Sequence, residues 1–380
     1  MLNKSGFTGN AQKKFLSILE EANTGLTTDI EIVSQDIVRF GLIKKLRLAE
    51  NKVKFTNPEL KEILDLILPE KIKREIKIDI NDVLPCGFSF SVKDTGHYRV
   101  LAYLTKHGIS LSIRKLPYTI PDIELLGIPE SITDMFLNAR GGLFIVTGPT
   151  GSGKTTTIAS MLEKINQSRH CKIVTIENPI EYVYLNSCSA FFQVEVGTHV
   201  HTVQDAMYHV LRSNPEIIFM GEIRSKEEAQ ACLSICETGH VVVTSYHVPD
   251  SVSAIERLIY EIGDIEITKN IIASNLIGAL NLRLFISDSK DSEGQLPETR
   301  FFYAFEYLPV SNNPVVRKMI SEMKFSEIRK FFIDTPYEQK KTGLVSFSES
   351  IRSLYLKGLA SEVLLNQHRY YDILATIKSG

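Results

Sequence analysis

The sequence predicts an α/β protein in which two domains follow one another along the chain. From about residue 125, short apolar runs alternate with segments of helical periodicity, a glycine-rich turn joins one such run to one such helix, and a proline-bounded connector precedes this region. Alternation of this kind is typical of a mostly parallel sheet covered by helices on both faces. At 380 residues the chain is long enough for two separate cores.

The first 115 residues predict a small α/β domain. Their apolar spacing predicts two helices and three strands, around residues 15–19, 60–67, 88–92, 98–104 and 109–113. The last two strands are separated by a short turn and form a hairpin. Because successive side chains of a strand alternate between its faces, Arg114 lies opposite Ile113 and points out of this domain's core.

Residues 116–124 predict a hinge linker between the two domains. Pro117 and Pro121 restrict the backbone and stop both helix and sheet, which favours a short stiff connector. We therefore place the first domain at residues 1–115 and the second at residues 125–380.

The second domain begins with the alternating pattern and ends with helices. We expect the chain to turn helical after about residue 305, with Phe347 and Ile351 on one apolar stripe and Gly358 as a C-terminal stop. Strands are predicted at residues 143–147, 172–176, 216–220 and 241–245.

Residues 148–155 read Gly-Pro-Thr-Gly-Ser-Gly-Lys-Thr, a complete G-x-x-x-x-G-K-[ST] phosphate-binding loop between a predicted strand and a predicted helix. Glycines let backbone N–H groups converge on phosphates, and the helix dipole favours negative charge. Lys154 would bridge the β- and γ-phosphates, and Thr155 would give its hydroxyl to Mg²⁺. The sequence therefore predicts ATP and Mg²⁺ as cofactors. The expected nucleotide-binding residues are Gly148, Thr150, Gly151, Ser152, Gly153, Lys154, Thr155 and Thr156.

Two carboxylates and two histidines bound other predicted strands. Glu222 ends an apolar run, where it could reach Mg²⁺ directly or through a water molecule, and is the Walker B candidate. Glu177 ends another run at the edge where open α/β sheets bind ligands, and we expect it to polarise the attacking water. His240 and His247 bracket a third strand and are interpreted as γ-phosphate sensors or interface groups.

Bulk composition restricts the classes of partner. The formal net charge of −2 gives no polycationic footprint, so direct nucleic-acid binding is not expected. The N-terminus lacks the apolar core of a signal peptide, and no apolar run approaches the ~20 residues that a membrane-spanning helix needs. Five cysteines are most simply reduced thiols, which predicts a cytoplasmic protein.

The order of four segments resembles the type II/IV secretion-system and type IV pilus ATPases of the GspE/PilT class. These segments are the phosphate loop, Thr-Ile-Glu-Asn-Pro-Ile-Glu, Gly-Glu-Ile-Arg and Glu-Thr-Gly-His…His, which match that family's Walker A, aspartate box, Walker B and histidine box. Residues 28–32 are similar to a strand at the start of the family's N-terminal domain. The resemblance implies a RecA-like P-loop ATPase domain preceded by a smaller PAS-like α/β domain. It also implies a homo-hexameric motor, docked peripherally on an inner-membrane platform protein.

The resemblance also gives two arginines a role. The segments around Arg99 and Arg114 are similar to those that supply the family's arginine fingers, whose planar, permanently charged forks suit a γ-phosphate. In this interpretation the nucleotide is clamped between the two domains, and hydrolysis lets them swing about the linker at residues 116–124.

Departures from the family pattern leave the machine and the rate open. Asn178 replaces the aspartate of the aspartate box, and Ser225 replaces the aspartate after Gly-Glu-Ile-Arg. The absence of a tetracysteine module and of an extra N-terminal domain favours the compact retraction-type motors or the ATPases of type IVB secretion and conjugation systems. Two alternatives remain: a DNA-translocating RecA-like ATPase, and a slow or non-hydrolysing nucleotide-gated interaction protein.

Overall fold

The computed structural model divides the chain into two compact units. The first unit comprises Met1–Thr119, Asn178–Val183 and Glu195–His201, and the second comprises Ile120–Glu177, Tyr184–Val194 and Thr202–Gly380. The residues described are 2–23, 27–42, 45–75, 79, 81, 84–116, 119–289, 298–334 and 343–360. Pro117 and Tyr118 of the predicted linker lie outside them, and its role as a hinge stays a prediction.

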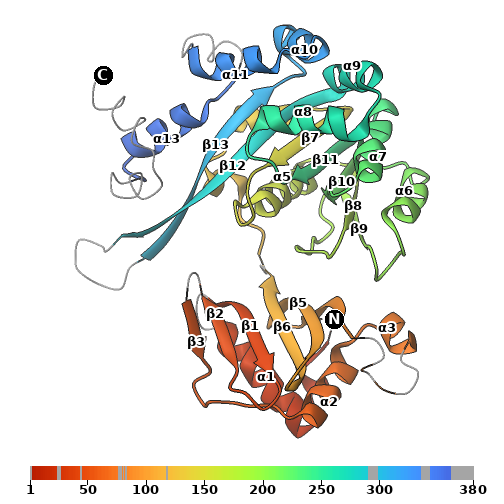
Figure 1. Cartoon of the computed structure of the whole chain (residues 1–380), viewed down its shortest axis with the longest axis vertical. Coiled ribbons are helices and arrows are strands. Elements are labelled where there is room, and N and C mark those ends of the chain that lie inside the picture. Colours follow the sequence, from red (N-terminus) through yellow and green to blue (C-terminus); the bar gives the residue numbers. More distant parts are fainter. Residues whose placement is uncertain are drawn as a thin grey trace. The chain divides into compact units, whose positions relative to one another are not determined.

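The first unit contains an antiparallel sheet of six described strands in the order β3-β2-β1-β6-β5-β4, with α1 and α2 packed on it (Figure 1). Its strands are β1 (Thr27–Val33), β2 (Arg39–Leu42), β3 (Lys45–Leu48), β4 (Cys86–Val92), β5 (Gly96–Thr105) and β6 (Gly108–Leu116). Its helical segments are η1 (Lys4–Gly6), α1 (Asn10–Asn23), α2 (Asn57–Ile67) and α3 (Glu70–Glu75).

Local signals explain these elements. Thr56 caps α2 in a reciprocal capping box with Glu59, and a proline follows in the first turn. On β5, Tyr98 and Val100 are buried in the core whereas Arg99 is exposed, as the strand alternation requires. The two predicted helices and the hairpin are therefore confirmed.

The second unit contains a mixed sheet of seven described strands in the order β13-β12-β7-β11-β10-β8-β9 (Figure 1). Its strands are β7 (Gly142–Thr147), β8 (Lys172–Glu177), β9 (Ala190–Glu195), β10 (Ile217–Glu222), β11 (Val241–Tyr246), β12 (Leu276–Ser289) and β13 (Glu298–Pro309). Its helical segments are η3 (Ile123–Leu126), α4 (Glu130–Leu137), α5 (Lys154–Ser168), α6 (Val203–Leu211), α7 (Lys226–Glu237), α8 (Ser251–Ile262), α9 (Ile265–Asn275), α10 (Pro314–Ser321), α11 (Phe325–Asp334) and α13 (Phe347–Leu356).

The centre of this sheet is parallel, and its carboxyl ends meet at one edge. β12, β7, β11, β10 and β8 pair in parallel in that order. The register aligns Thr147 with Tyr246, so the residues that follow these two strands emerge side by side. α6 to α9 contact one another in series, whereas α5 contacts α4 and η3, which is the division between two faces expected of right-handed crossovers. All four predicted strands of this domain are confirmed.

The sequence interpretation of the region after these strands was incomplete. β12 and β13 form a long antiparallel hairpin, whose second strand runs to Pro309 before the chain turns helical at α10. The helical turn expected after about residue 305 therefore starts later, because cross-strand pairing extends the sheet. The predicted stripe on Phe347 and Ile351 lies on α13, and Gly358 follows that helix with φ +69°. Residues 361–380 lie outside the described residues.

Candidate nucleotide-binding site

The phosphate loop occupies the turn between β7 and α5. Gly148, Gly151 and Gly153 all have positive φ, at 136°, 77° and 89°, a region that L side chains rarely adopt. Gly153 is the N-cap of α5, which begins at Lys154, so the loop opens directly onto a helix N-terminus. Backbone N–H groups at such a terminus are ready donors to an anion.

The hairpin of β12 and β13 packs against one side of this loop. A Cβ on Gly148 would lie 2.5 Å from the carbonyl oxygen of Leu282, and one on Gly153 would lie 2.2 Å from Cε1 of Tyr303. By contrast, a Cβ on Gly151 would meet nothing within 4 Å. The loop therefore packs closely on one side and is open at its crest. Neither Leu282 nor Tyr303 was a predicted site residue, since no local pattern links them to the loop.

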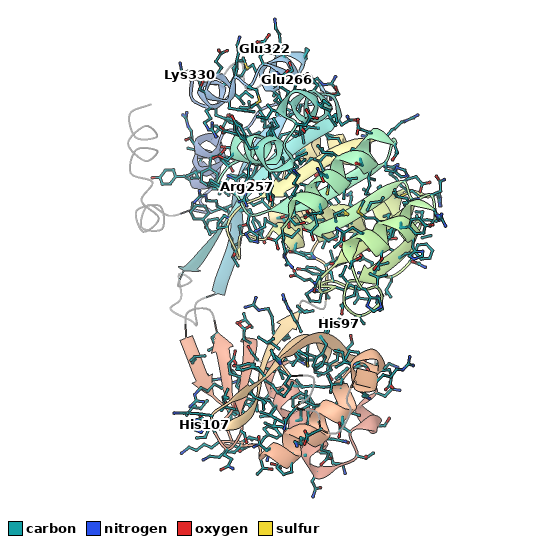
Figure 2. The ribbon with its side chains drawn as sticks, turned by 45° about the vertical axis from the view of Figure 1, so that its right-hand side comes forward. His97, His107, Arg257, Glu266, Glu322 and Lys330 are labelled. Atoms are coloured by element: carbon teal, nitrogen blue, oxygen red, sulfur yellow. The ribbon has the colours of Figure 1, made fainter. Side chains whose placement is uncertain are left out.

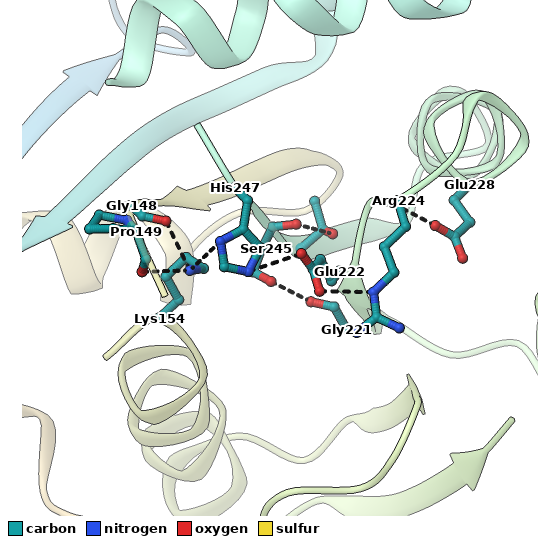
Figure 3. A network of polar contacts seen from close by, with 10 residues as sticks. Gly148, Pro149, Lys154, Gly221, Glu222, Arg224, Glu228, Ser245 and His247 are labelled. Atoms are coloured by element: carbon teal, nitrogen blue, oxygen red, sulfur yellow. Dashed lines mark hydrogen bonds and ion pairs between the residues drawn. The ribbon is translucent and has the colours of Figure 1, made fainter. Parts of the chain in front are cut away.

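Lys154 lies inside the loop and is only 7% exposed. Its ammonium donates to the carbonyl oxygens of Gly148 at 2.9 Å and Pro149 at 3.0 Å, and to Nδ1 of His247 at 3.3 Å (Figure 3). The carbonyl oxygens of the loop thus hold the Lys154 ammonium, and a bound phosphate would compete with them for it.

His247 connects Lys154 to Glu222. Its Nε2 lies 3.0 Å from Oε1 of Glu222, whose other oxygen accepts from Nε of Arg224 at 2.9 Å (Figure 3). Burial, followed by the Lys154 ammonium, lowers the pKa of His247 although Glu222 opposes the shift. A neutral ring with its proton on Nε2 satisfies both contacts, because Nδ1 then accepts from Lys154 and Nε2 donates to Glu222.

The two predicted carboxylates lie at the same edge of the sheet. Glu177 is the last residue of β8 and is 4% exposed, and Glu222 is the last residue of the adjacent β10. Ser245 donates from Oγ to the carbonyl oxygen of Gly221 at 2.7 Å, which ties the end of β10 to β11. The structure therefore brings Glu222, His247 and Lys154 into one network and places Glu177 on the neighbouring strand.

Comparison with known proteins identifies the family. The family described as "Type II/IV secretion system protein" matches residues 17–313. The chain belongs to this family. The family consists of P-loop ATPases of secretion and pilus machines, so the chain is a P-loop ATPase that uses a nucleotide.

Several members of the type II/IV secretion system family are similar over most of their length. The uncharacterized protein YggR of Escherichia coli (strain K12) is 31% identical over 298 residues, which are 78% of this chain and 85% of the relative. A twitching motility protein of Neisseria gonorrhoeae is 30% identical over 278 residues, which are 73% of this chain and 70% of the relative.

Solved structures give the same result. The crystal structure of the pilus retraction motor PilT with bound ADP matches with a TM-score of 0.73 at 27% identity, covering 91% of this chain and 94% of PilT. The ATPase DotB of Legionella pneumophila matches with a TM-score of 0.73 at 22% identity, covering 95% of each chain, which supports the fold. The predicted fold, a RecA-like ATPase domain after an N-terminal domain, is thereby confirmed.

The structure does not bring His240 to the same place as His247. His240 precedes β11 and His247 follows it, so the two lie at opposite edges of the parallel sheet. Nδ1 of His240 lies 2.8 Å from Oγ1 of Thr238, at the end of α7. Within one chain His240 is therefore not placed to sense the γ-phosphate held at the other edge, and only its role as an interface group stays a prediction.

The two predicted arginine fingers lie on the first unit's sheet. Arg99 of β5 and Arg114 of β6 are directly opposite each other, and both are exposed. Arg114 forms an ion pair with Asp29 of β1, with Nε 2.9 Å from Oδ1. The outward orientation predicted for Arg114 is confirmed, since its side chain is 61% exposed.

Ser225 has a structural role that its sequence context could have predicted. It is the N-cap of α7, where its hydroxyl accepts from the backbone N–H of Glu228 and the Glu228 carboxylate accepts from the backbone N–H of Ser225. Serine and aspartate cap helices about equally well. Ser225 therefore keeps the N-cap of α7 where the family pattern has an aspartate.

Proposed function

We propose that this ATPase works as a homo-hexameric motor that powers a type IV pilus or a type IV, type IVB or conjugative secretion machine. The observation that carries the proposal is the continuous network from Lys154 through His247 to Glu222 and Arg224. A phosphate that recruits Lys154 removes one partner of His247, so nucleotide binding reaches the Walker B carboxylate through direct contacts. Coupling of this kind is what a motor needs.

The phosphate loop fits a nucleoside triphosphate. Left-handed glycines allow backbone N–H groups of the loop to converge on a phosphate, and the open crest at Gly151 leaves room for phosphate oxygens. Thr155 and Thr156 lie half-buried in the first turn of α5, whereas Thr150 is exposed on the loop and Ser152 is buried. We assign the whole loop from Gly148 to Thr156 to phosphate binding.

The same edge fits a magnesium ion. Hydroxyl and carboxylate oxygens are the hard ligands that Mg²⁺ prefers, and Thr155 and Glu222 present one of each at the carboxyl edge of the sheet. When bound, the ion would neutralise charge on the β- and γ-phosphates. Glu222 would hold the ion directly or through a water molecule. Its two oxygens, which contact Arg224 and His247 in the structure, would then bind the ion as well.

Glu177 is proposed to polarise the attacking water, and His247 to respond to the γ-phosphate. A carboxylate at the end of β8 that is 4% exposed is shielded from bulk solvent, which strengthens its interaction with a nearby water molecule. Arg99 and Arg114 are proposed as arginine fingers. An exposed ion pair such as Arg114 with Asp29 contributes only about 0–1 kcal/mol, so little free energy is lost when Arg114 leaves Asp29 for a phosphate.

The assembly and its site of action are proposed from the family. Relatives named as a type IV pilus retraction ATPase and as type II secretion system protein E act in membrane machines. We propose that this chain binds an inner-membrane platform protein from the cytoplasmic side. None of the helices in the described ranges is long and apolar enough to cross a bilayer.

Steady-state ATPase assays test the proposal. Lys154→Ala should lose nucleotide binding, and Glu222→Gln should keep binding but lose turnover. His247→Ala tests the edge that carries the phosphate loop, and His240→Ala tests the opposite edge, because the two histidines bound the same strand. Equal background rates in the native protein and in Lys154→Ala would overturn the motor proposal and favour the nucleotide-gated alternative.

The arginine fingers and the DNA alternative have separate tests. Arg99→Ala or Arg114→Ala should retain nucleotide binding and lose most turnover, and normal hydrolysis in either variant removes that residue from the proposal. Stimulation of the ATPase by DNA at physiological salt, weakening as salt rises, would instead favour the DNA-translocating alternative.

A further inference from the structure

Tyr246 is the last residue of β11 and immediately precedes His247. Its side chain is 2% exposed, and its hydroxyl donates to Oε2 of Glu261 on α8. This bond ties the end of the strand to the helix that packs over the sheet. It is the last side-chain anchor before the chain reaches the histidine that contacts Lys154 and Glu222.

Arg257, labelled in Figure 2, lies on the same helix and contacts both partners of this bond. Its guanidinium carbon lies 5.0 Å from the centre of the Tyr246 ring, and its Nε lies 3.5 Å from Oε2 of Glu261. Burial, with the neighbouring Glu261 carboxylate, raises the pKa of Tyr246. The phenol therefore keeps its proton and remains a donor at any physiological pH.

The residues after His247 are fixed as well. Asn281 donates to the carbonyl oxygen of Pro249 at 3.0 Å, and the Ser251 backbone and hydroxyl both donate to Oε1 of Glu306, at 3.0 and 2.7 Å. His247 is thus bracketed by anchors to three other elements. Its own contacts, at 3.3 Å and 3.0 Å, lie on opposite sides of the ring, so a small shift of the backbone would break one of them.

We propose that Tyr246, through its hydrogen bond to Glu261, is a positioning residue that sets the distance of the His247 ring from Lys154 and Glu222. The proposal rests on the proposed function of this site. Because Tyr246 immediately precedes His247, a movement of α8 would be transmitted through this hydrogen bond to the backbone of the histidine.

The test compares variants of the full chain. Tyr246→Phe keeps the ring and removes the hydroxyl, and Glu261→Ala removes the acceptor. Each should lower kcat by about 10-fold or more, since misplacing a catalytic contact by 1 Å can cost about 100-fold. KM for ATP and the Kd of a fluorescent ADP analogue should change less than two-fold. Glu261→Gln keeps an oxygen that accepts and should keep most of the turnover.

Two comparisons separate positioning from general structure. Tyr246→Phe combined with Glu261→Ala should be no slower than the slower of the two single variants, because each of them removes the same hydrogen bond. Tyr260→Phe is the matched control, since Tyr260 lies on the same helix and is 58% exposed. Unchanged kcat in Tyr246→Phe, or additive losses in the double variant, would overturn the proposal that Tyr246 acts through its bond to Glu261. So would a rise in KM equal to the loss in kcat.

A spectroscopic readout keeps the inference testable without turnover. The imidazole ¹⁵N resonances of His247, assigned by their loss in His247→Ala, should move in Tyr246→Phe and stay in Tyr260→Phe. If the native protein hydrolyses no more ATP than Lys154→Ala, the proposed function fails while these resonances still decide the positioning. If they are identical in native protein and Tyr246→Phe, the positioning role is refuted whatever the rate.

Discussion

Replacing Gly153 with alanine tests how the phosphate loop is held against the hairpin of β12 and β13. Gly153 has φ +89°, and a Cβ there would lie 2.2 Å from Cε1 and 2.6 Å from the hydroxyl of Tyr303. Ordinary van der Waals contact begins at 3.4 Å. Tyr303 is only 8% exposed, so its ring has little room to move away. The substitution therefore combines backbone strain with a clash.

The magnitude follows from these two effects. A left-handed conformation costs a non-glycine residue about 1–2 kcal/mol. Overpacking a filled interior adds about 1–3 kcal/mol. Gly151→Ala isolates the first effect, because Gly151 has φ +77° and nothing within 4 Å of its would-be Cβ. Gly153→Ala should therefore be less stable than Gly151→Ala by about 1–3 kcal/mol.

Calorimetry is a suitable assay, since the chain contains no tryptophan to report unfolding. In a domain of this size each kcal/mol lowers Tm by about 2–4 °C, so the two variants should differ by at least about 2 °C. Combining Gly153→Ala with Tyr303→Ala should cost less than the sum of the single losses, because the clash disappears. Equal Tm values for Gly151→Ala and Gly153→Ala, with additive losses in the double variant, would refute the reasoning.

Three further predictions concern the buried groups and thiols. Burial raises the pKa of Glu306 above its ordinary value of 4.5, so the native protein loses stability as pH rises through the raised value. Glu306→Gln keeps an oxygen for both Ser251 donors, so its calorimetric Tm should equal that of the native protein at pH 4 and exceed it at pH 8. Cys188 is exposed whereas burial raises the pKa of Cys236 to about 12, so a maleimide should label Cys188 first and Cys188→Ser should abolish the fast phase. Phe136 is fully buried, and Phe136→Ala should lower the free energy of unfolding by about 3–5 kcal/mol, measured by the calorimetric Tm.

The central strands and the loop could be predicted because their signals are local. Strands buried on both faces read as continuous apolar runs with sharp ends, as residues 143–147 and 241–245 do. The hairpin of β12 and β13 was missed because a largely apolar segment such as residues 276–286 is compatible with either a helix or a strand. The segment is a strand because it pairs with residues 298–309, and the periodicity of a single segment carries no information about such pairing.

The site was predicted where residues follow the ends of strands, and missed where contacts join distant segments. Lys154 and Glu222 follow from the loop and a strand end. The contact of Tyr303 with Gly153 and the bond between Tyr246 and Glu261 have no local signature. The sequence placed His240 and His247 at the two ends of one strand, and in the structure only the His247 end lies at the edge that carries the phosphate loop.

The opposed arginines of the first unit have a consequence for its stability. Like charges directly opposite on neighbouring strands destabilise a sheet, and Asp29 compensates from the Arg114 side. The sheet therefore folds against the repulsion between Arg99 and Arg114, which an anion lying between their guanidinium groups would relieve. This repulsion is part of the folding free energy of the sheet, whether or not an anion is present.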